Sequence, residues 1–103
     1  TVQQVLDYIN ASGVIVTSYD FKTANYTLLS TDSTIECTAN SFTITLPTAV
    51  GADGKLYSIK NTGTGVITID ADGTETIDGN LTQTLINSES LTIQSNGSNW
   101  VII

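Results

Sequence analysis

Four acidic side chains lie close together in the stretch from Thr68 to Asn80, which reads TIDADGTETIDGN. They are Asp70, Asp72, Glu75 and Asp78, and the whole chain of 103 residues carries only ten acidic residues. Carboxylate oxygens are preferred ligands of Ca²⁺ in proteins. The first chemistry to consider for this sequence is therefore metal binding by an acidic loop.

The spacing of these acids differs from that of a helix-flanked calcium loop. Such a loop has oxygen ligands at positions 1, 3 and 5, glycine at position 6 and a bidentate glutamate at position 12. Counted from Asp70, position 6 is Glu75 and position 12 is Leu81. The pattern therefore fails at the positions that are most specific for calcium.

We interpret ADG in this stretch as a tight turn between two strands, VITID and ETIDG. Glycine takes a positive φ at no steric cost, so Gly73 suits such a turn. Asp70 and Asp72 are one residue apart and would share a face if the strand continued. A surface calcium site on Asp70 and Asp72 is therefore the alternative.

The residue types needed for most hydrolytic chemistry are missing. The chain has no histidine, and Cys37 is its only cysteine. These facts exclude Ser-His-Asp and Cys-His arrangements as well as histidine-bearing zinc sites. The carboxylates of one loop are also poorly placed to flank a sugar for glycoside hydrolysis. We expect no enzymatic activity and no cofactor, and we interpret Cys37 as a small buried apolar residue.

The net charge restricts the partners of the chain. Three lysines against ten acids give a net charge of -7 and a pI near 4.1. A surface of that sign repels phosphate backbones and anionic lipids, so we expect no binding to nucleic acid. No apolar run approaches the roughly 20 residues that span a bilayer, so we expect no membrane insertion.

Aromatic side chains offer a second kind of site, because they combine a large apolar face with a polar edge. The aromatic candidates for sugar binding are Tyr8, Tyr19, Phe21, Tyr26, Phe42, Tyr57 and Trp100. Trp100, the only tryptophan, lies in the final segment NWVII directly after the turn SNGSN. We expect its ring to pack against the core or a neighbouring subunit. A solvent-facing platform that contacts a saccharide is the alternative.

One segment has helical periodicity. In residues 1–12 the apolar side chains Val2, Val5, Leu6 and Ile9 recur with helical spacing, and Gly13 follows as a stop signal. A helix of about 12 residues is marginal in water, so it must pack on another surface. Val2, Val5 and Ile9 fit successive a, d and a positions of a heptad, the positions that form the axial seam of a parallel oligomer. Packing of the helix on its own domain is the alternative.

From Gly13 to Ile103 the hydrophobic period falls to two. Short segments rich in β-branched or aromatic residues alternate with turn sequences such as GADG, NTGTG and SNGSN. Strands at such spacing are typical of a β-sandwich or barrel. Because the chain has no room for crossover helices, we predict one all-β domain over residues 13–103, an antiparallel β-sandwich that is jelly-roll-like or barrel-like.

Alternation within the strands also predicts which side chains form the core. In SFTITLP, for example, the aromatic and aliphatic residues point to one face and the threonines point to the other. The outward threonines favour β-structure without adding charge. The core residues predicted in this way are Phe42, Ile44, Leu46, Ile67, Ile69, Leu91 and Ile93.

Several motifs follow one another between Tyr26 and Ile103. They are ITLPTA, KLYSIKNTGTG, TIDG, LTQTL and LTIQSNGSNWVII. With these motifs the region resembles a β-module of tail-fibre and baseplate proteins of bacteriophages and prophages. The resemblance covers about three quarters of the chain and brings no catalytic motif with it.

The resemblance implies a non-enzymatic structural module, commonly a homotrimer, in the host-recognition apparatus of a phage tail. Its location would be the virion, extracellular on the mature particle. Its partners would be other tail or baseplate proteins, or the host surface. The alternative function is that of a carbohydrate-binding module for a saccharide of the host cell wall or surface.

Overall fold

The computed structural model describes residues 17–103, and all the regular structure of this region is β-strand. The strands are β1 (Tyr19–Lys22), β2 (Tyr26–Thr27), β3 (Thr34–Cys37), β4 (Phe42–Thr45), β5 (Leu56–Asn61), β6 (Ile67–Asp70), β7 (Thr82–Leu85), β8 (Ser90–Ser95) and β9 (Trp100–Ile102). The predicted all-β class is therefore confirmed. The helix predicted over residues 1–12 lies outside the described residues.

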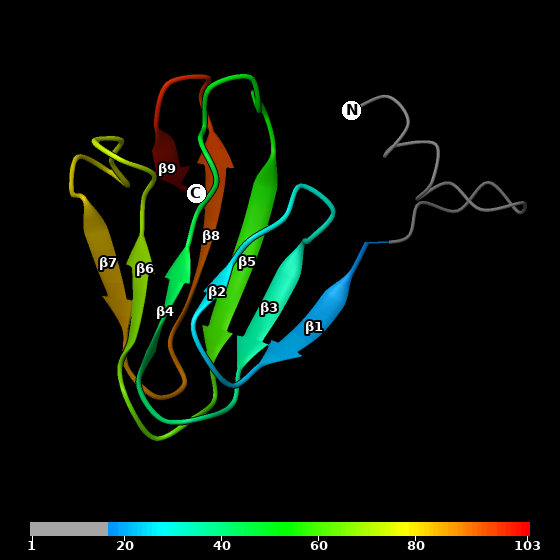
Figure 1. The fold of residues 1–103 in the computed structure, drawn as a ribbon, viewed down its shortest axis with the longest axis vertical. Helices are drawn as coiled ribbons and strands as arrows, with labels where there is room; N and C mark the ends of the chain where they lie inside the picture. Colours follow the sequence, from blue (N-terminus) through cyan, green and yellow to red (C-terminus); the bar gives the residue numbers. More distant parts are fainter. Residues whose placement is uncertain (1–16) are drawn as a thin grey trace, which may run out of the picture.

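The strands form two sheets that share one core (Figure 1). One sheet has five strands in the order β1-β3-β5-β8-β9, and the other has four in the order β2-β4-β6-β7. From β1 to β6 the chain passes alternately from one sheet to the other. In Figure 1, β1 lies at one side of the molecule, and β7 and β9 lie towards the other.

The strand pairing is mixed, so the predicted antiparallel arrangement is wrong for the first six strands. β1 pairs with β3, β3 with β5, β2 with β4, and β4 with β6, all in parallel. Parallel neighbours need a long crossover connection, which is commonly a helix. Here the crossover between two strands of one sheet is a strand of the other sheet. No helix is needed, and the absence of room for helices therefore did not exclude parallel pairing.

Every antiparallel pair includes one of the last three strands, β7, β8 or β9. β7 returns against β6, β8 against β5, and β9 against β8. The central strands β5 and β6 therefore have a parallel neighbour on one side and an antiparallel neighbour on the other. Their registers align apolar side chains in rows across the inner faces, as in the row Ile35, Ile59 and Leu91.

The core has the composition that alternation predicted, with one exception. Phe42 is only partly buried and packs against the margin of the core. Full burial of an aliphatic side chain stabilises a fold by about 1.5–3 kcal/mol, so these inner rows are the main source of stability. The predicted core residues that are buried are Ile44, Leu46, Ile67, Ile69, Leu91 and Ile93.

One polar side chain is completely buried between the sheets. Asn61, the last residue of β5, donates from Nδ2 to the carbonyl oxygens of Gly65 and Leu85, each at 2.8 Å. Its Oδ1 accepts a hydrogen bond from the Gly63 amide at 3.0 Å. A Cβ atom on Gly63 would stand 2.0 Å from the carbonyl oxygen of Ala39, so this turn requires glycine. The NTGTG turn is thus fixed to both sheets.

Candidate functional site

The acidic loop is the connection between β6 and β7, residues 71–81. Gly73 has a φ of 53°, as predicted for a turn. ETIDG, which was expected to be a strand, contributes only isolated bridges, in which Ile77 pairs with Asn80 and, in parallel, with Trp100 of β9. The loop therefore leaves one sheet and reaches the outer edge of the other.

Two of the acids hold this loop against its neighbours. Glu75 accepts hydrogen bonds from the Thr48 hydroxyl and, at 2.8 Å, from the Ala49 amide. Asp78 accepts a hydrogen bond at 2.9 Å from the amide of Ile102 in β9. An unpaired strand edge invites association with other chains. The loop covers the edge of β9, and Asp78 supplies an acceptor that a further strand would otherwise supply.

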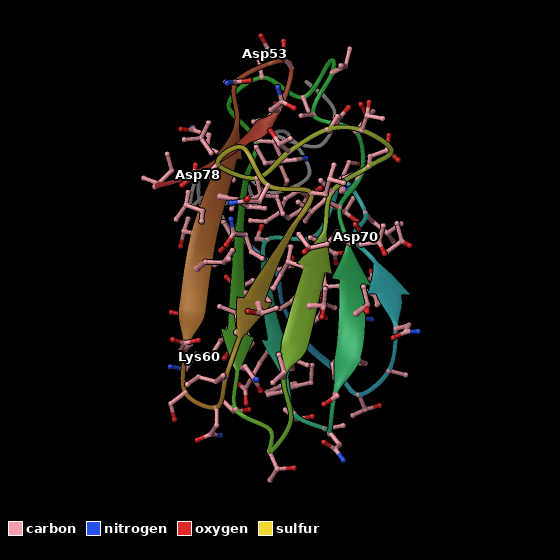
Figure 2. The ribbon with its side chains drawn as sticks, turned by 90° about the vertical axis from the view of Figure 1, so that its left-hand side faces the viewer. Asp53, Lys60, Asp70 and Asp78 are labelled. Atoms are coloured by element: carbon pink, nitrogen blue, oxygen red, sulfur yellow. The ribbon has the colours of Figure 1, made fainter. Side chains whose placement is uncertain are left out.

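Asp70 and Asp72 do not join these acids in one cluster. Asp70 ends β6 in register with Thr45 and Thr82, and Asp72 is exposed in the loop. Figure 2 shows Asp70 beside β6, away from Asp78, which lies near the other sheet. Among residues 17–103, no three acidic or cysteine side chains are grouped as they would be around a metal ion.

Trp100 is a core residue. It is 1% exposed, its ring centroid lies 5.5 Å from that of Tyr57, and its Nε1 donates to the carbonyl oxygen of Pro47 at 3.2 Å. The expectation of core packing is confirmed. The alternative of a saccharide platform on Trp100 is wrong, because the face of the indole ring is not accessible to a ligand.

The exposed aromatic rings lie on β1 instead. Tyr19 and Phe21 are 55% and 63% exposed, and their ring centroids are 5.6 Å apart in an edge-to-face arrangement. Asp20 and Lys22 are the residues of β1 on the core side of the sheet. They pair with the buried Ile35 and Cys37 of β3. Tyr19 and Phe21 were among the aromatic candidates for sugar binding, but sequence reasoning singled out Trp100 and did not predict that these two rings lie together on an exposed face. The Tyr-x-Phe pair interleaved with charged residues was the available signal.

A carboxylate fixes the tyrosine of this pair. Glu36 on β3 accepts hydrogen bonds from the hydroxyl of Tyr19 at 2.6 Å and from that of Thr62 at 2.8 Å. These two hydrogen bonds, and then the positive charge of Lys60, lower the pKa of Glu36. The hydrogen bond from Tyr19 to Glu36 raises the pKa of the Tyr19 phenol. At neutral pH an ionised carboxylate therefore orients a protonated phenol.

Polar side chains continue from the aromatic pair across the sheet. Paired residues of neighbouring strands lie side by side on the same face. Within one row, the hydroxyls of Ser58 and Thr92 are 2.9 Å apart. The two rows are Tyr19, Thr34, Ser58 and Thr92, and Phe21, Glu36, Lys60 and Ser90. We call the surface formed by these eight residues the aromatic face.

A second polar cluster lies at the turn between β2 and β3. Asp32 is only 5% exposed, and its Oδ2 accepts from the Tyr26 hydroxyl at 2.7 Å and from the Leu29 amide at 2.8 Å. Burial, and then the hydrogen bond to Asp32, raise the pKa of Tyr26 to about 12. Lys22 places its Nζ 3.8 Å from the centroid of the Tyr26 ring. These contacts satisfy one another and stabilise the turn.

Cys37 is fully buried as a free thiol. Burial raises its pKa to about 11, and the neighbouring charge of Glu36 acts in the same direction. A thiol with such a pKa is a poor nucleophile at neutral pH. The prediction that Cys37 acts as a small core residue is confirmed.

The residues predicted for the oligomer interface, Val2, Val5, Leu6 and Ile9, lie outside the described part of the chain. Within the described part, no helix is long and apolar enough to span a bilayer. In comparisons with known proteins, no family model, no curated protein and no solved structure matches the chain.

Proposed function

We propose that the chain is a non-enzymatic structural module of a bacteriophage tail fibre or baseplate. In this proposal it forms a homotrimer on the virion and docks a partner virion protein or the host surface during adsorption. The observation that carries the proposal is the difference between two edges of the five-stranded sheet. The acidic loop covers β9, whereas no strand of residues 17–103 pairs with the outer edge of β1.

The position of β1 in the chain supports association at this edge. β1 follows closely on residues 1–12, whose Val2, Val5 and Ile9 have the spacing of a heptad seam. In a parallel trimer built on that seam, the three β1 strands begin near the threefold axis. The two sheets around one core then act as a β-sandwich head at the end of the seam.

The motifs of the phage resemblance correspond to distinct structural tasks, which supports the assignment. NTGTG fixes both sheets through Asn61, and TIDG supplies Ile77 and Asp78 to the cover of β9. LTIQSNGSNWVII forms the β8–β9 hairpin that buries Trp100. The carboxylates of Asp32, Glu36, Glu75 and Asp78 all accept hydrogen bonds within the fold, which favours structural roles for them.

Charged substitutions in the full chain test the seam. Val5→Asp and Ile9→Asp each place a charge on the predicted axis and should convert trimers to monomers, as measured by light scattering. Gln4→Asp adds the same charge on the opposite side of the predicted helix and should leave the mass unchanged. A trimer that persists in both seam variants would exclude the seam.

A further inference from the structure

The aromatic face is not built like the centre of an ordinary protein contact. The fully buried core of a protein interface is depleted in charged residues. Here the apolar part is confined to Tyr19 and Phe21, and the same rows continue with hydroxyl and charged groups. Exposed rings beside regularly spaced hydrogen-bonding groups suit a ligand whose own surface combines apolar C–H faces with hydroxyls. Sugar rings have that surface.

The platform is also rigid before any ligand arrives. Glu36 holds the Tyr19 hydroxyl, and Thr62 holds the other oxygen of Glu36. The Phe21 ring lies against the Tyr19 ring, and 63% of the surface of Phe21 remains exposed. A preorganised aromatic side chain loses little conformational entropy on binding. The rows cross four strands, or about 14 Å at the usual strand spacing, which accommodates an oligosaccharide rather than a single sugar.

The charge of the chain selects among saccharides. With a net charge of -7, the protein repels polyanionic ligands such as uronic-acid or phosphate-bearing glycans. The ionised Glu36 lies on the aromatic face itself, and Lys60 next to it gives its Nζ hydrogen bond to the Ser88 carbonyl oxygen. The ligand should therefore be free of acidic groups.

We infer that the aromatic face is a binding site for a neutral oligosaccharide, with Phe21 and Tyr19 stacking on sugar rings and the adjacent polar rows binding hydroxyls. This inference rests on the proposed function, because it gives the docking module its ligand on the host surface. It differs from the proposal in its test, since sugar binding and oligomeric state are measured separately.

The experiment uses the full chain on an array of neutral oligosaccharides of glucose, galactose, mannose and N-acetylglucosamine beside uronic-acid oligosaccharides. The strongest binder is then titrated by calorimetry. We expect binding to at least one neutral oligosaccharide and none to the acidic ones. Phe21→Ala should weaken it about tenfold or more, a loss of about 1.4 kcal/mol. Leu81→Ala is the matched control, because Leu81 is 56% exposed outside the aromatic face, and it should bind like the wild type.

Three results would overturn the inference. They are binding to none of the neutral oligosaccharides, equal affinity in Phe21→Ala and the wild type, and preference for the acidic oligosaccharides. Light scattering on the same samples distinguishes failure of the sugar site from failure of the proposed trimeric module. If Phe21→Ala lowers the mass of a trimer that binds no sugar, the aromatic face is a contact between copies and the trimeric module stands. A monomer that binds sugar through Phe21 supports the site and contradicts the trimer.

Discussion

The side chain of Asn61 joins the two sheets, because it belongs to β5 and donates to the carbonyl oxygen of Leu85 in β7. Asn61→Ala would remove the buried amide that donates to the carbonyl oxygens of Gly65 and Leu85, whereas the Gly63 amide would keep its hydrogen bond to the carbonyl oxygen of Cys37 at 3.1 Å. A buried polar group without a partner costs about 1–3 kcal/mol, so we expect a loss of about 3 kcal/mol in the free energy of unfolding. Urea denaturation measures it.

The control for this prediction is Asn80→Ala. Asn80 is exposed, and its hydrogen bonds with Ile77 join backbone atoms. A surface substitution of this kind stays within about 0.5 kcal/mol of the wild type. Equal losses at Asn61 and Asn80 would show that the buried amide does not join the sheets.

The raised pKa of Tyr26 predicts how the stability of the fold changes with pH in the alkaline range. Its folded pKa of about 12 exceeds the ordinary value of 10.0, so the folded state holds the phenolic proton more tightly. The resulting stabilisation is complete below pH 10 and is lost as the pH rises towards 12. We expect the urea midpoint to fall across this window.

Tyr26→Phe should make that fall shallower without abolishing it. The Cys37 thiol, with its pKa raised from 9.0 to about 11, contributes a loss of stability in the same direction at slightly lower pH. Urea midpoints measured at successive pH values compare the variant with the wild type. An unchanged slope in Tyr26→Phe would mean that burial and the hydrogen bond to Asp32 do not raise the pKa of Tyr26 in solution.

Among the elements, β9 has its outer edge covered by Asp78, whose carboxylate accepts a hydrogen bond from the Ile102 amide. Its φ of 50° lies in the left-handed region, which glycine and asparagine tolerate better than most residues. Asp78→Gly keeps the backbone conformation and loses the acceptor, whereas Asp78→Asn keeps both. We expect faster hydrogen exchange of the Ile102 amide in Asp78→Gly and little change in Asp78→Asn. Equal protection in both variants would contradict the role of the side chain.

The acidic loop should respond little to calcium, because its carboxylates are divided between two parts of the fold. Glu75 binds the segment after β4, and Asp78 binds β9. Millimolar Ca²⁺ should leave the melting temperature of the full chain unchanged in a thermal scan. A rise that Asp70→Ala and Asp72→Ala both abolish would restore the metal site on these two residues.

Alternation in the sequence predicted most elements and their inner faces, since it depends only on local geometry. It could not predict pairing, because whether successive strands share a sheet depends on how the whole chain is wound. No inner face was predicted for β1, where Asp20 and Lys22 lie opposite the buried Ile35 and Cys37, and Tyr19 and Phe21 are exposed. An edge strand has a neighbouring strand on one side only and therefore covers less of the core. The rule that apolar side chains point inward is weakest in such a strand.

At the scale of the whole molecule, the two edges of the five-stranded sheet have different roles. The loop of residues 71–81 covers β9, while no strand of residues 17–103 pairs with the outer edge of β1. A domain with one protected and one open edge suits a module in a larger assembly. We propose that copies of this chain associate as a trimer through the side that carries β1.

Light scattering coupled to size exclusion measures the mass of the full chain in solution and so tests for the trimer. The proposal predicts a mass of three times 10.9 kDa that persists on dilution to micromolar concentration. A mass of one chain, 10.9 kDa, in the same micromolar sample would contradict the trimeric module.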